Sequence, residues 1–482
     1  MSVQDKYETV IGLEVHAQLL TETKMFCSCR NHFGSEPNTL ICPVCTGQPG
    51  SLPVVNRRAI ELGVRAALAL NCQINERSVF ARKNYFYPDL PKGYQISQYE
   101  APFSQHGHLF VTLKSGDVRK IGVTRAHFEE DAGKSSHVGT GSLVNLNRAG
   151  VPLVEIVSEP DMRNSHEAAQ YLRTVRSLLR YAEVCDGNME EGSFRCDANI
   201  SVRLKGAKEF GTKVELKNIN SFRYVERAID FEIERQIQLI EKGEKITQQT
   251  RSWDPAKNVT ELMREKENAH DYRYFPDPDL AVLVIDEPWR KSIESSMPEL
   301  PRAIRERFKE TFGLSDYDAG VLTAEKELAK FYESVVKGSA NAKMSANWVM
   351  NELLGKLNAN GQSIEQSPIS ADDLGALVAK VVSNEISGKM AKMVFEEMFD
   401  SGKSAASIIQ QKGLSQISDT DSLEPIVKAV VQKNPTQVAD YLGGKDKLLG
   451  FFVGQVMKET KGQANPATLN EIVKKVLEGE RK

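Results

Sequence analysis

The sequence VIGLEVHAQL, at residues 10–19, alternates between apolar and polar positions. One set of positions is apolar: Ile11, Leu13, Val15, Ala17 and Leu19. The other set carries Gly12, Glu14, His16 and Gln18. Successive residues of a β-strand point to opposite faces of the sheet. The segment therefore predicts a strand with one face in a core and with Glu14 and His16 side by side on the other face.

The same alternation recurs at residues 195–204 and 213–217, which predicts two further strands of this kind. Their polar faces carry Asp197 and Glu215, and also basic residues: Arg195, Arg203, Lys213 and Lys217. Apolar residues at helical spacing predict helices over residues 165–182 and 222–240. The first part of the chain is therefore predicted to be an α+β body dominated by a sheet.

The sequence PELP, at residues 298–301, marks a change from strand patterns to helical patterns. Beyond it, helix starts are predicted near residues 370 and 465. We expect a catalytic body over residues 1–292, a helical domain over residues 293–405 and a small helical tail over residues 406–482. From Lys445 onward the tail has eight basic and five acidic residues, which suits either contact with phosphates or an ordinary solvated helix face.

The composition excludes several classes of protein. The chain has 482 residues, of which 40% are hydrophobic and 26% are charged, as in globular proteins. No apolar run approaches the roughly 18 residues that a membrane span needs. The N-terminus shows no targeting segment, so we expect a cytoplasmic protein with reduced cysteines. The net charge of −3 gives no overall attraction for nucleic acid.

Four cysteines form two close pairs, Cys27 with Cys29 and Cys42 with Cys45. Four thiolates at this spacing can close a tetrahedral Zn²⁺ site, and because no fourth position is left open, such a site would be structural. The alternative is two unrelated pairs of reduced thiols. Isolated cysteines are expected in the core: Cys72, Cys185 and Cys196.

The second candidate site consists of Glu14, His16, Asp197 and Glu215 on the polar strand faces. Carboxylate oxygens with one imidazole suit Mg²⁺ and the phosphates of a nucleotide. The nearby basic residues fit phosphoryl transfer. The alternative is an ordinary solvated sheet face.

The common nucleotide-binding loops are absent from the sequence. Gly133-Lys-Ser135 resembles the end of a P-loop, but Phe128 stands where the first glycine belongs. The chain has neither the Gly-x-Gly-x-x-Gly pattern nor the Gly-x-Ser-x-Gly nucleophile motif. Any ATP would therefore be held in another way.

Ten local sequences, in this order, resemble the B subunits of glutamine-dependent aspartyl/glutamyl-tRNA amidotransferases. They are VIGLEVH (10–16), RKNYFYPD (82–89), YQISQ (94–98), HFEEDAGK (127–134), NRAGVPLVEIVSEPD (147–161), EEGSFRCDAN (190–199), KNINSF (217–222), DYRYFP (271–276), FFVGQVM (451–457) and KGQANP (461–466). Together they cover essentially the whole chain.

This resemblance implies a cradle-like antiparallel catalytic sheet, similar to glutamine synthetase and guanidino kinases, followed by a helical domain and a tRNA-binding tail. It implies ATP-dependent phosphorylation of the side-chain carboxylate of Glu or Asp esterified to tRNA(Gln) or tRNA(Asn). Ammonia from the A subunit, an amidase, would then displace the phosphate, and a small C subunit would complete the heterotrimer. Which of the two charged tRNAs is the substrate stays open.

The resemblance also implies roles for individual residues. Expected Mg²⁺ ligands and catalytic residues are His16, Glu130 and Glu215, with Glu14 and Asp197 completing the cluster. Residues expected to contact phosphate or substrate are Lys83, Arg148 and Arg195. The four cysteines are similar to a zinc knuckle of some family members. Asn145 departs from the family pattern, which usually has Asp there.

Two other functions remain open at this stage. One is a non-catalytic, zinc-stabilised RNA-binding protein, which would leave the acidic strand faces unexplained. The other is a free-standing ligase acting on a small carboxylate, against which the long helical part argues.

Overall fold

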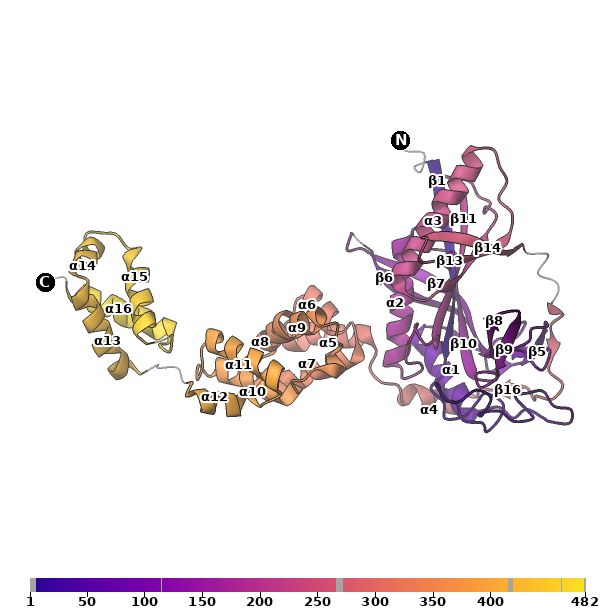
Figure 1. Cartoon of the computed structure of the whole chain (residues 1–482), viewed down its shortest axis with the longest axis horizontal. Coiled ribbons are helices and arrows are strands. Elements are labelled where there is room, and N and C mark those ends of the chain that lie inside the picture. The colour runs from indigo at the N-terminus through magenta and orange to yellow at the C-terminus, as the bar shows by residue number, and fades with distance from the viewer. Residues whose placement is uncertain (1–5, 114, 266–271, 415–418, 461, 481–482) are drawn as a thin grey trace. The chain divides into compact units, whose positions relative to one another are not determined.

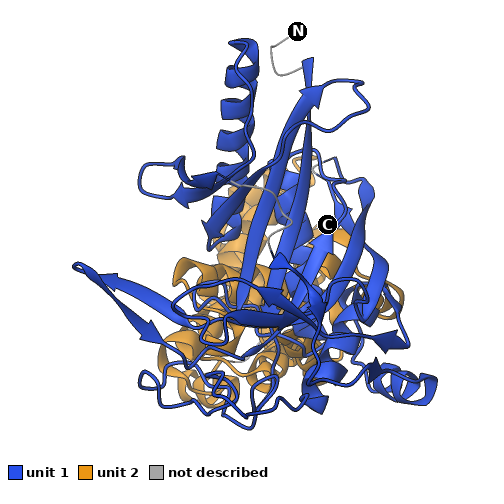
Figure 2. Cartoon of the chain, turned by 90° about the vertical axis from the view of Figure 1, so that its right-hand side faces the viewer, with its two compact units in different colours: residues 1–301 blue, residues 302–482 orange. Residues whose placement is uncertain are grey.

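The computed structural model describes residues 6–113, 115–265, 272–414, 419–460 and 462–480 (Figure 1). Motif residues Asp271 and Lys461 and the basic residues Arg481 and Lys482 lie outside the described residues. The chain divides into two compact units, residues 1–301 and 302–482 (Figure 2). The division falls at the end of the PELP segment. None of the described helices is long and apolar enough to cross a membrane.

Within the described residues, nine strands form the main sheet of the first unit, in the order β14-β13-β12-β11-β1-β10-β7-β6-β2. Their bounds are β1 Tyr7–Gln18, β2 Gln73–Ile74, β6 Ser104–Thr112, β7 Val118–Glu130, β10 Pro152–Ser158, β11 Phe194–Leu204, β12 Val214–Ile219, β13 Gln249–Asp254 and β14 Val259–Glu265. The shorter strands are β3 Arg77–Ser78, β4 Ala81–Asn84, β5 Tyr94–Ser97, β8 Lys134–Val138, β9 Gly141–Asn145, β15 Phe275–Pro276 and β16 Leu283–Val284.

The sheet is mixed, which corrects the expectation of an antiparallel sheet at one pairing. Strands β12 and β13 run parallel, whereas the other neighbouring strands of the main sheet run antiparallel. Parallel neighbours need a crossover connection, usually a helix. Helix α3 (Phe222–Glu241) lies in the chain between these two strands and supplies that connection.

Helices cover the apolar face of the sheet. Three of the helices of the first unit pack on its strands: α1 (Arg57–Ala69), α2 (Ser165–Tyr181) and α3. Helix α1 approaches β7 closely at Gly63, where an added Cβ would lie 2.1 Å from the ring of Phe128. The predicted apolar face of residues 10–19 lies in this core, with Ile11, Val15 and Ala17 fully buried. The polar side chains of β1 therefore lie on the face opposite this core.

The second unit is helical. Helix α4 (Glu287–Ser295) precedes it, and the unit itself contains α5 Pro301–Phe312, α6 Asp316–Leu322, α7 Lys326–Ser339, α8 Ala342–Asn347, a π-helix Trp348–Leu353, α9 Leu354–Ala359, a 3₁₀ turn Ile364–Gln366, α10 Ala371–Val382, α11 Gly388–Ser401, α12 Ala405–Lys412, α13 Thr420–Lys433, α14 Pro435–Leu442, α15 Leu448–Glu459 and α16 Pro466–Gly479. Residues from Leu423 to Leu477 form a hydrophobic cluster of their own. The expected boundary near residue 405 stays a prediction.

Candidate functional site

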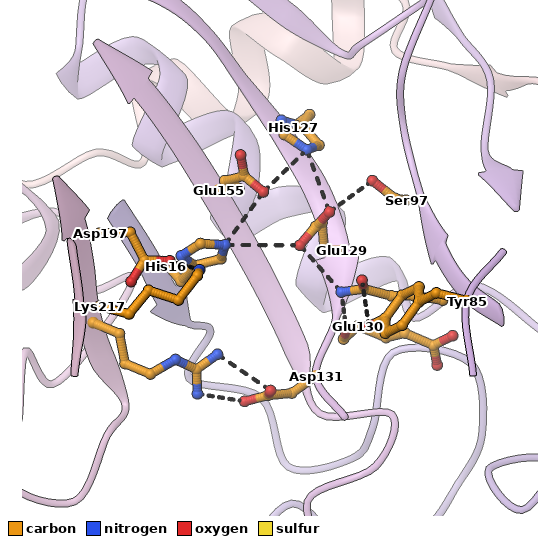
Figure 3. A network of polar contacts seen from close by, with 12 residues as sticks. His16, Tyr85, Ser97, His127, Glu129, Glu130, Asp131, Glu155, Asp197 and Lys217 are labelled. Atoms are coloured by element: carbon orange, nitrogen blue, oxygen red, sulfur yellow. Dashed lines mark hydrogen bonds and ion pairs between the residues drawn. The ribbon is translucent and has the colours of Figure 1, made fainter. Parts of the chain in front are cut away.

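The strand register brings four ionisable side chains into one row across the sheet. His16 of β1 pairs with Arg195 of β11 on one side and with Glu155 of β10 on the other. Glu155 pairs in turn with His127 of β7. Residues that pair directly across strands point to the same face, so the row lies on the polar face. Figure 3 shows His16, Glu155 and His127 directed toward one another.

His16, Glu129 and Glu155, here called the histidine group, can place one ligand atom each within 4.8 Å of one another. His16 Nε2 lies 3.3 Å from a carboxylate oxygen of Glu155 and 4.0 Å from one of Glu129. His127 Nε2 lies 3.5 Å from the Glu129 carboxylate and 3.6 Å from that of Glu155. The two acids are therefore bridged by two imidazoles (Figure 3).

The charges of the histidine group largely balance one another. Burial lowers the pKa of His16, but the hydrogen bond and the charge of Glu155 outweigh it and raise the pKa to about 9. Burial raises the pKa of Glu155, but His127 and His16 hold it well below its usual range. The Lys83 and His127 charges likewise lower the pKa of Glu129 against the effect of burial. The two carboxylates are thus anions, with the cations of His16 and Lys83 beside them.

Glu14, Asp197 and Glu215, here called the acidic group, also place one oxygen each within 4.8 Å of one another. Lys217 forms ion pairs with Asp197 and Glu215. Burial raises the pKa of Glu14, and the negative charges of Glu155, Asp197 and Glu215 raise it further. Glu14 therefore lies in a negative environment, as the direction of its pKa shows.

The acidic group also has neutral hydrogen-bond partners. Thr250 Oγ1 donates to Glu215 Oε2 at 2.7 Å. Asn199 Nδ2 donates to Glu14 Oε1 at 2.8 Å. These bonds fix the orientation of two carboxylates before any cation arrives. Hard oxygen donors suit Mg²⁺, so the donor set fits the metal.

The structure brings Glu130 into neither group. Its carboxylate accepts a hydrogen bond from Ile96 N at 2.9 Å and forms an ion pair with Lys92. The neighbouring Glu129 takes the place beside His16, because residues 127 and 129 of β7 share the polar face. Of the five expected ligands, one lies in the histidine group and three form the acidic group. The metal role of the fifth, Glu130, stays a prediction.

Sequence reasoning did not select Glu129, Glu155 or His127. Glu129 and His127 alternate along β7 as Glu14 and His16 do along β1, and that period-2 signal was present in the sequence. Glu155 stands alone among apolar residues in the segment LVEIV, where no alternation distinguishes it. Only the pairing of β1 with β10 shows that it lies beside His16.

The expected phosphate-contacting residues differ in what already binds them. Arg195 and Arg148 both form ion pairs with Asp131, at 2.9 Å and 3.6 Å. Arg148 also donates to two main-chain carbonyls. Burial raises the pKa of Asp131, but Arg195 and Arg148 hold it below its usual range. Lys83 lies instead over the Tyr272 ring, with Nζ 5.1 Å from the ring centroid.

Two cavities flank the carboxylates. The first, of about 510 Å³, is lined by residues that include Glu14, Glu129, Glu155 and Lys83. The second, of about 520 Å³, has a lining that includes His16, Arg195, Asp197, Lys217, Asn218 and Phe194. Each cavity lies in the size range of small-molecule sites. The polar face can therefore accommodate two ligands, one beside Glu14, Glu129 and Glu155 and the other beside Asp197.

The four predicted zinc ligands meet in space. Cys27, Cys29, Cys42 and Cys45 place their sulfur atoms within 4.8 Å of one another. The Sγ atoms of Cys42 and Cys45 are 3.9 Å apart. A tetrahedral Zn²⁺ with bonds of about 2.3 Å separates its sulfur ligands by ~3.8 Å. The donor set fits a closed zinc site, and Cys72, Cys185 and Cys196 are buried as expected.

The cysteine loop is connected to Lys24 and to strand β9 through charge and hydrogen bonds. The side chain of Lys24 is fully buried, and its Nζ lies 3.6 Å from Cys45 Sγ. A hydrogen bond from Cys27, the Cys42 amide and the Lys24 charge lower the pKa of Cys45 to about 4, against the effect of burial. Asn145, the departure from the family pattern, accepts a hydrogen bond from Asn38 N at 3.3 Å and so holds this loop.

Comparison of this sequence with known proteins shows the family to which the chain belongs. Residues 9–291 match the GatB/GatE catalytic domain and residues 330–477 match the GatB domain. The chain belongs to this family of amidotransferase B subunits. Two relatives are named as the B subunit of aspartyl/glutamyl-tRNA(Asn/Gln) amidotransferase. The one from Syntrophotalea carbinolica is 54% identical, over 98% of this chain and 99% of its own. The one from Geobacter sulfurreducens is 55% identical, over 98% of this chain and 100% of its own.

Family membership makes the chain part of an amidotransferase, an enzyme of the ligase type. A non-catalytic RNA-binding protein is therefore no longer an equal alternative.

Proposed function

We propose that this chain activates the side-chain carboxylate of Glu or Asp esterified to tRNA(Gln) or tRNA(Asn). A carboxylate oxygen attacks the γ-phosphorus of ATP, and ADP leaves. Ammonia then attacks the acyl phosphate, inorganic phosphate leaves, and the side chain becomes an amide. The observation that carries the proposal is the polar face, on which the histidine group and the acidic group lie beside two cavities. The chain is also similar to amidotransferase B subunits along 98% of its length.

The acidic group, together with His16 and Glu129, would hold Mg²⁺ during this reaction. When bound, Mg²⁺ neutralises phosphate charge and supports in-line transfer. We place Glu129 rather than Glu130 in this set, because Glu129 faces His16 whereas Glu130 is bound to Lys92 and Ile96 N.

The basic residues divide into two roles in this proposal. Lys83 lines the first cavity and Arg195 lines the second, so each is placed to contact phosphate or carboxylate oxygens. Arg148 is bound to Asp131 and to main-chain carbonyls, and it would act by holding the end of β7 in position. The four cysteines would hold a structural Zn²⁺.

Further parts of the proposal come from the resemblance to the family. The sheet would correspond to the cradle of glutamine synthetase and guanidino kinases. The helical part would form one domain to residue 405 and a tRNA-binding tail beyond it. Ammonia would reach the site from the amidase, the A subunit, and a small C subunit would complete the heterotrimer in the cytoplasm.

The test is ADP release from ATP by the chain co-purified with its amidase partner. Glu-tRNA(Gln), correctly charged Gln-tRNA(Gln) and uncharged tRNA are compared for wild type and Glu215→Gln. Glu261→Gln, at a surface glutamate with a 53% exposed side chain, is the matched control. We expect ADP release only with Glu-tRNA(Gln), near-normal release in the control, and its loss in Glu215→Gln.

Release that does not depend on the amino acid carried by the tRNA would contradict activation of that amino acid. Equal release by Glu215→Gln and wild type would contradict the assigned site.

A further inference from the structure

Lys24 is a fully buried lysine, which is rare for this residue type. It lies between strand β1 and the cysteine loop, residues 27–45. Within the described ranges of the chain, no carboxylate forms an ion pair with Lys24. A buried ammonium group is costly without an anion beside it. The group that can supply this anion is the Cys45 thiol, whose Sγ lies 3.6 Å from Lys24 Nζ.

The ammonium group of Lys24 has three acceptors. Nζ donates to the carbonyl of Leu40 at 2.7 Å and to that of Leu146 at 3.5 Å, and Cys45 Sγ is the third acceptor. The main-chain amide of Lys24 also donates to the Cys29 carbonyl, at 3.0 Å. Three of these four acceptors belong to the cysteine loop, so Lys24 is bound to the part of the chain that carries the four thiols.

The stem of the Lys24 side chain is packed against the main chain at Gly150. A Cβ added at Gly150 would lie 3.5 Å from Lys24 Cδ and 3.4 Å from Cys45 Cβ, so Gly150 lies directly against both side chains. Its φ of +85° also favours glycine. The amide of Met25 donates to the Gly150 carbonyl at 2.8 Å and holds the two segments together. The ammonium group is therefore in position before a metal ion binds, which lowers the cost of binding.

A zinc site made of four cysteines needs a nearby cation. Zn²⁺ neutralises half of the charge of four thiolates, so a closed site of this kind keeps a net negative charge. Cys45 is the most buried of the four cysteines, with 4% of its surface exposed, and it is the one that Lys24 contacts. The buried ammonium group and the buried thiolate therefore offset each other's charge.

We propose that Lys24 is the counter-ion of the four-cysteine site and raises its affinity for Zn²⁺. The inference rests on the proposed zinc site and is independent of the reaction on the polar face. Groups that contact a metal ligand without binding the metal typically change the metal affinity about 10- to 100-fold. Lys24 thus contributes to the zinc site through its charge, although its ammonium group does not bind the ion.

The test is the zinc affinity of the full-length chain carrying Lys24→Met or Lys24→Gln, measured by competition with a chromophoric chelator. Both substitutions remove the charge, and glutamine keeps a donor for the Leu40 carbonyl. We expect Kd for Zn²⁺ to rise at least about tenfold in both variants. Lys120→Met, which removes an exposed lysine of β7, is the matched control and should keep the wild-type affinity.

Replacement of Zn²⁺ by Co²⁺ separates the effect of the charge from a merely structural role. At saturating Co²⁺, the variants should keep the absorption bands of tetrahedral coordination by four thiolates. The thiolate-to-cobalt charge-transfer band should move to longer wavelength, because loss of the nearby positive charge raises the energy of the sulfur electrons. An equal band position in the wild type and both variants would overturn the counter-ion role.

Unchanged zinc affinity in both variants would also overturn it. Wild-type affinity in Lys24→Gln alone would overturn it as well, because a hydrogen bond rather than the charge would then explain the effect. Lys24→Gln carries the test if Lys24→Met does not fold. If the wild type itself binds no zinc, the proposed zinc site fails together with the inference, whereas zinc binding with equal Kd in all proteins overturns the inference alone.

Discussion

The histidine group and the acidic group share strand β1, yet their charges are balanced in opposite ways. In the histidine group, two imidazoles lie within 4.0 Å of Glu129 or Glu155, and the pKa values of both acids are lowered. In the acidic group, Lys217 is paired with Asp197 and Glu215, and the pKa of Glu14 is raised. The acidic group therefore has the greater need for an added cation.

The largest expected effect comes from removing a carboxylate of the acidic group. Glu215→Gln should raise the Mg²⁺ concentration for half-maximal ADP release by more than about 100-fold, because loss of an outer-shell partner alone costs 10–100-fold. Glu155→Gln should change this Mg²⁺ requirement less, since the charges of His16 and Lys83 already offset the carboxylates of the histidine group. Magnesium titrations of the two variants check the difference, and an equal shift in both would remove the distinction between the groups.

A second comparison separates the neighbouring acids of β7. Glu129→Gln should lower turnover at least about tenfold more than Glu130→Gln, because only Glu129 faces His16. Glu130→Gln should lower thermal stability instead, since it leaves Lys92 with a neutral partner in a buried position. Turnover and thermal unfolding of both variants test this assignment. A greater loss of turnover in Glu130→Gln would restore the role expected from the family resemblance.

A smaller effect is expected from the partner that orients Glu215. Thr250→Val removes the hydroxyl that donates to Glu215 Oε2 and keeps the side-chain shape. The apparent affinity for Mg²⁺ should fall about tenfold. Thr247→Val, at a neighbouring threonine, is the control. An unchanged Mg²⁺ titration would show that the hydroxyl does not position this carboxylate.

The smallest expected effect is a dependence on pH. Because the pKa of Glu14 is raised, this carboxylate becomes protonated at a higher pH than an ordinary glutamate, whose pKa is about 4.3. Protonation removes a metal ligand, so the affinity for Mg²⁺ should fall as pH is lowered through the raised pKa. Isothermal titration with Mg²⁺ from neutral to mildly acidic pH checks this. A pH dependence of equal size in Glu14→Gln would assign the effect to another group.

The sequence predicted the strands that carry the site better than it predicted the site itself. Strict alternation at residues 10–19 and 195–204 corresponds to β1 and β11, and it correctly places Glu14, His16 and Asp197 on the polar face. Glu155 was not predicted as a site residue. Both faces of β10 are largely buried, so apolar and polar residues do not alternate along this strand. A partner on another strand, not a local pattern, defines its position.

The choice between Glu129 and Glu130 has the same physical origin. Two adjacent acids at the end of a strand differ only in the face to which they point, and a shift of one residue in register exchanges them. The pairing of β7 with β10 fixes that register. The cysteine loop was easier to predict because four thiols at short spacing have few other arrangements.

Anomalous diffraction from crystals of the full chain soaked with Mn²⁺ and ADP tests the assignment of the metal site most directly. We expect a manganese peak within about 2.2 Å of carboxylate oxygens of Glu14, Asp197 and Glu215. Manganese bound instead at Glu130, or no peak at the acidic group while manganese-dependent ADP release persists, would contradict it.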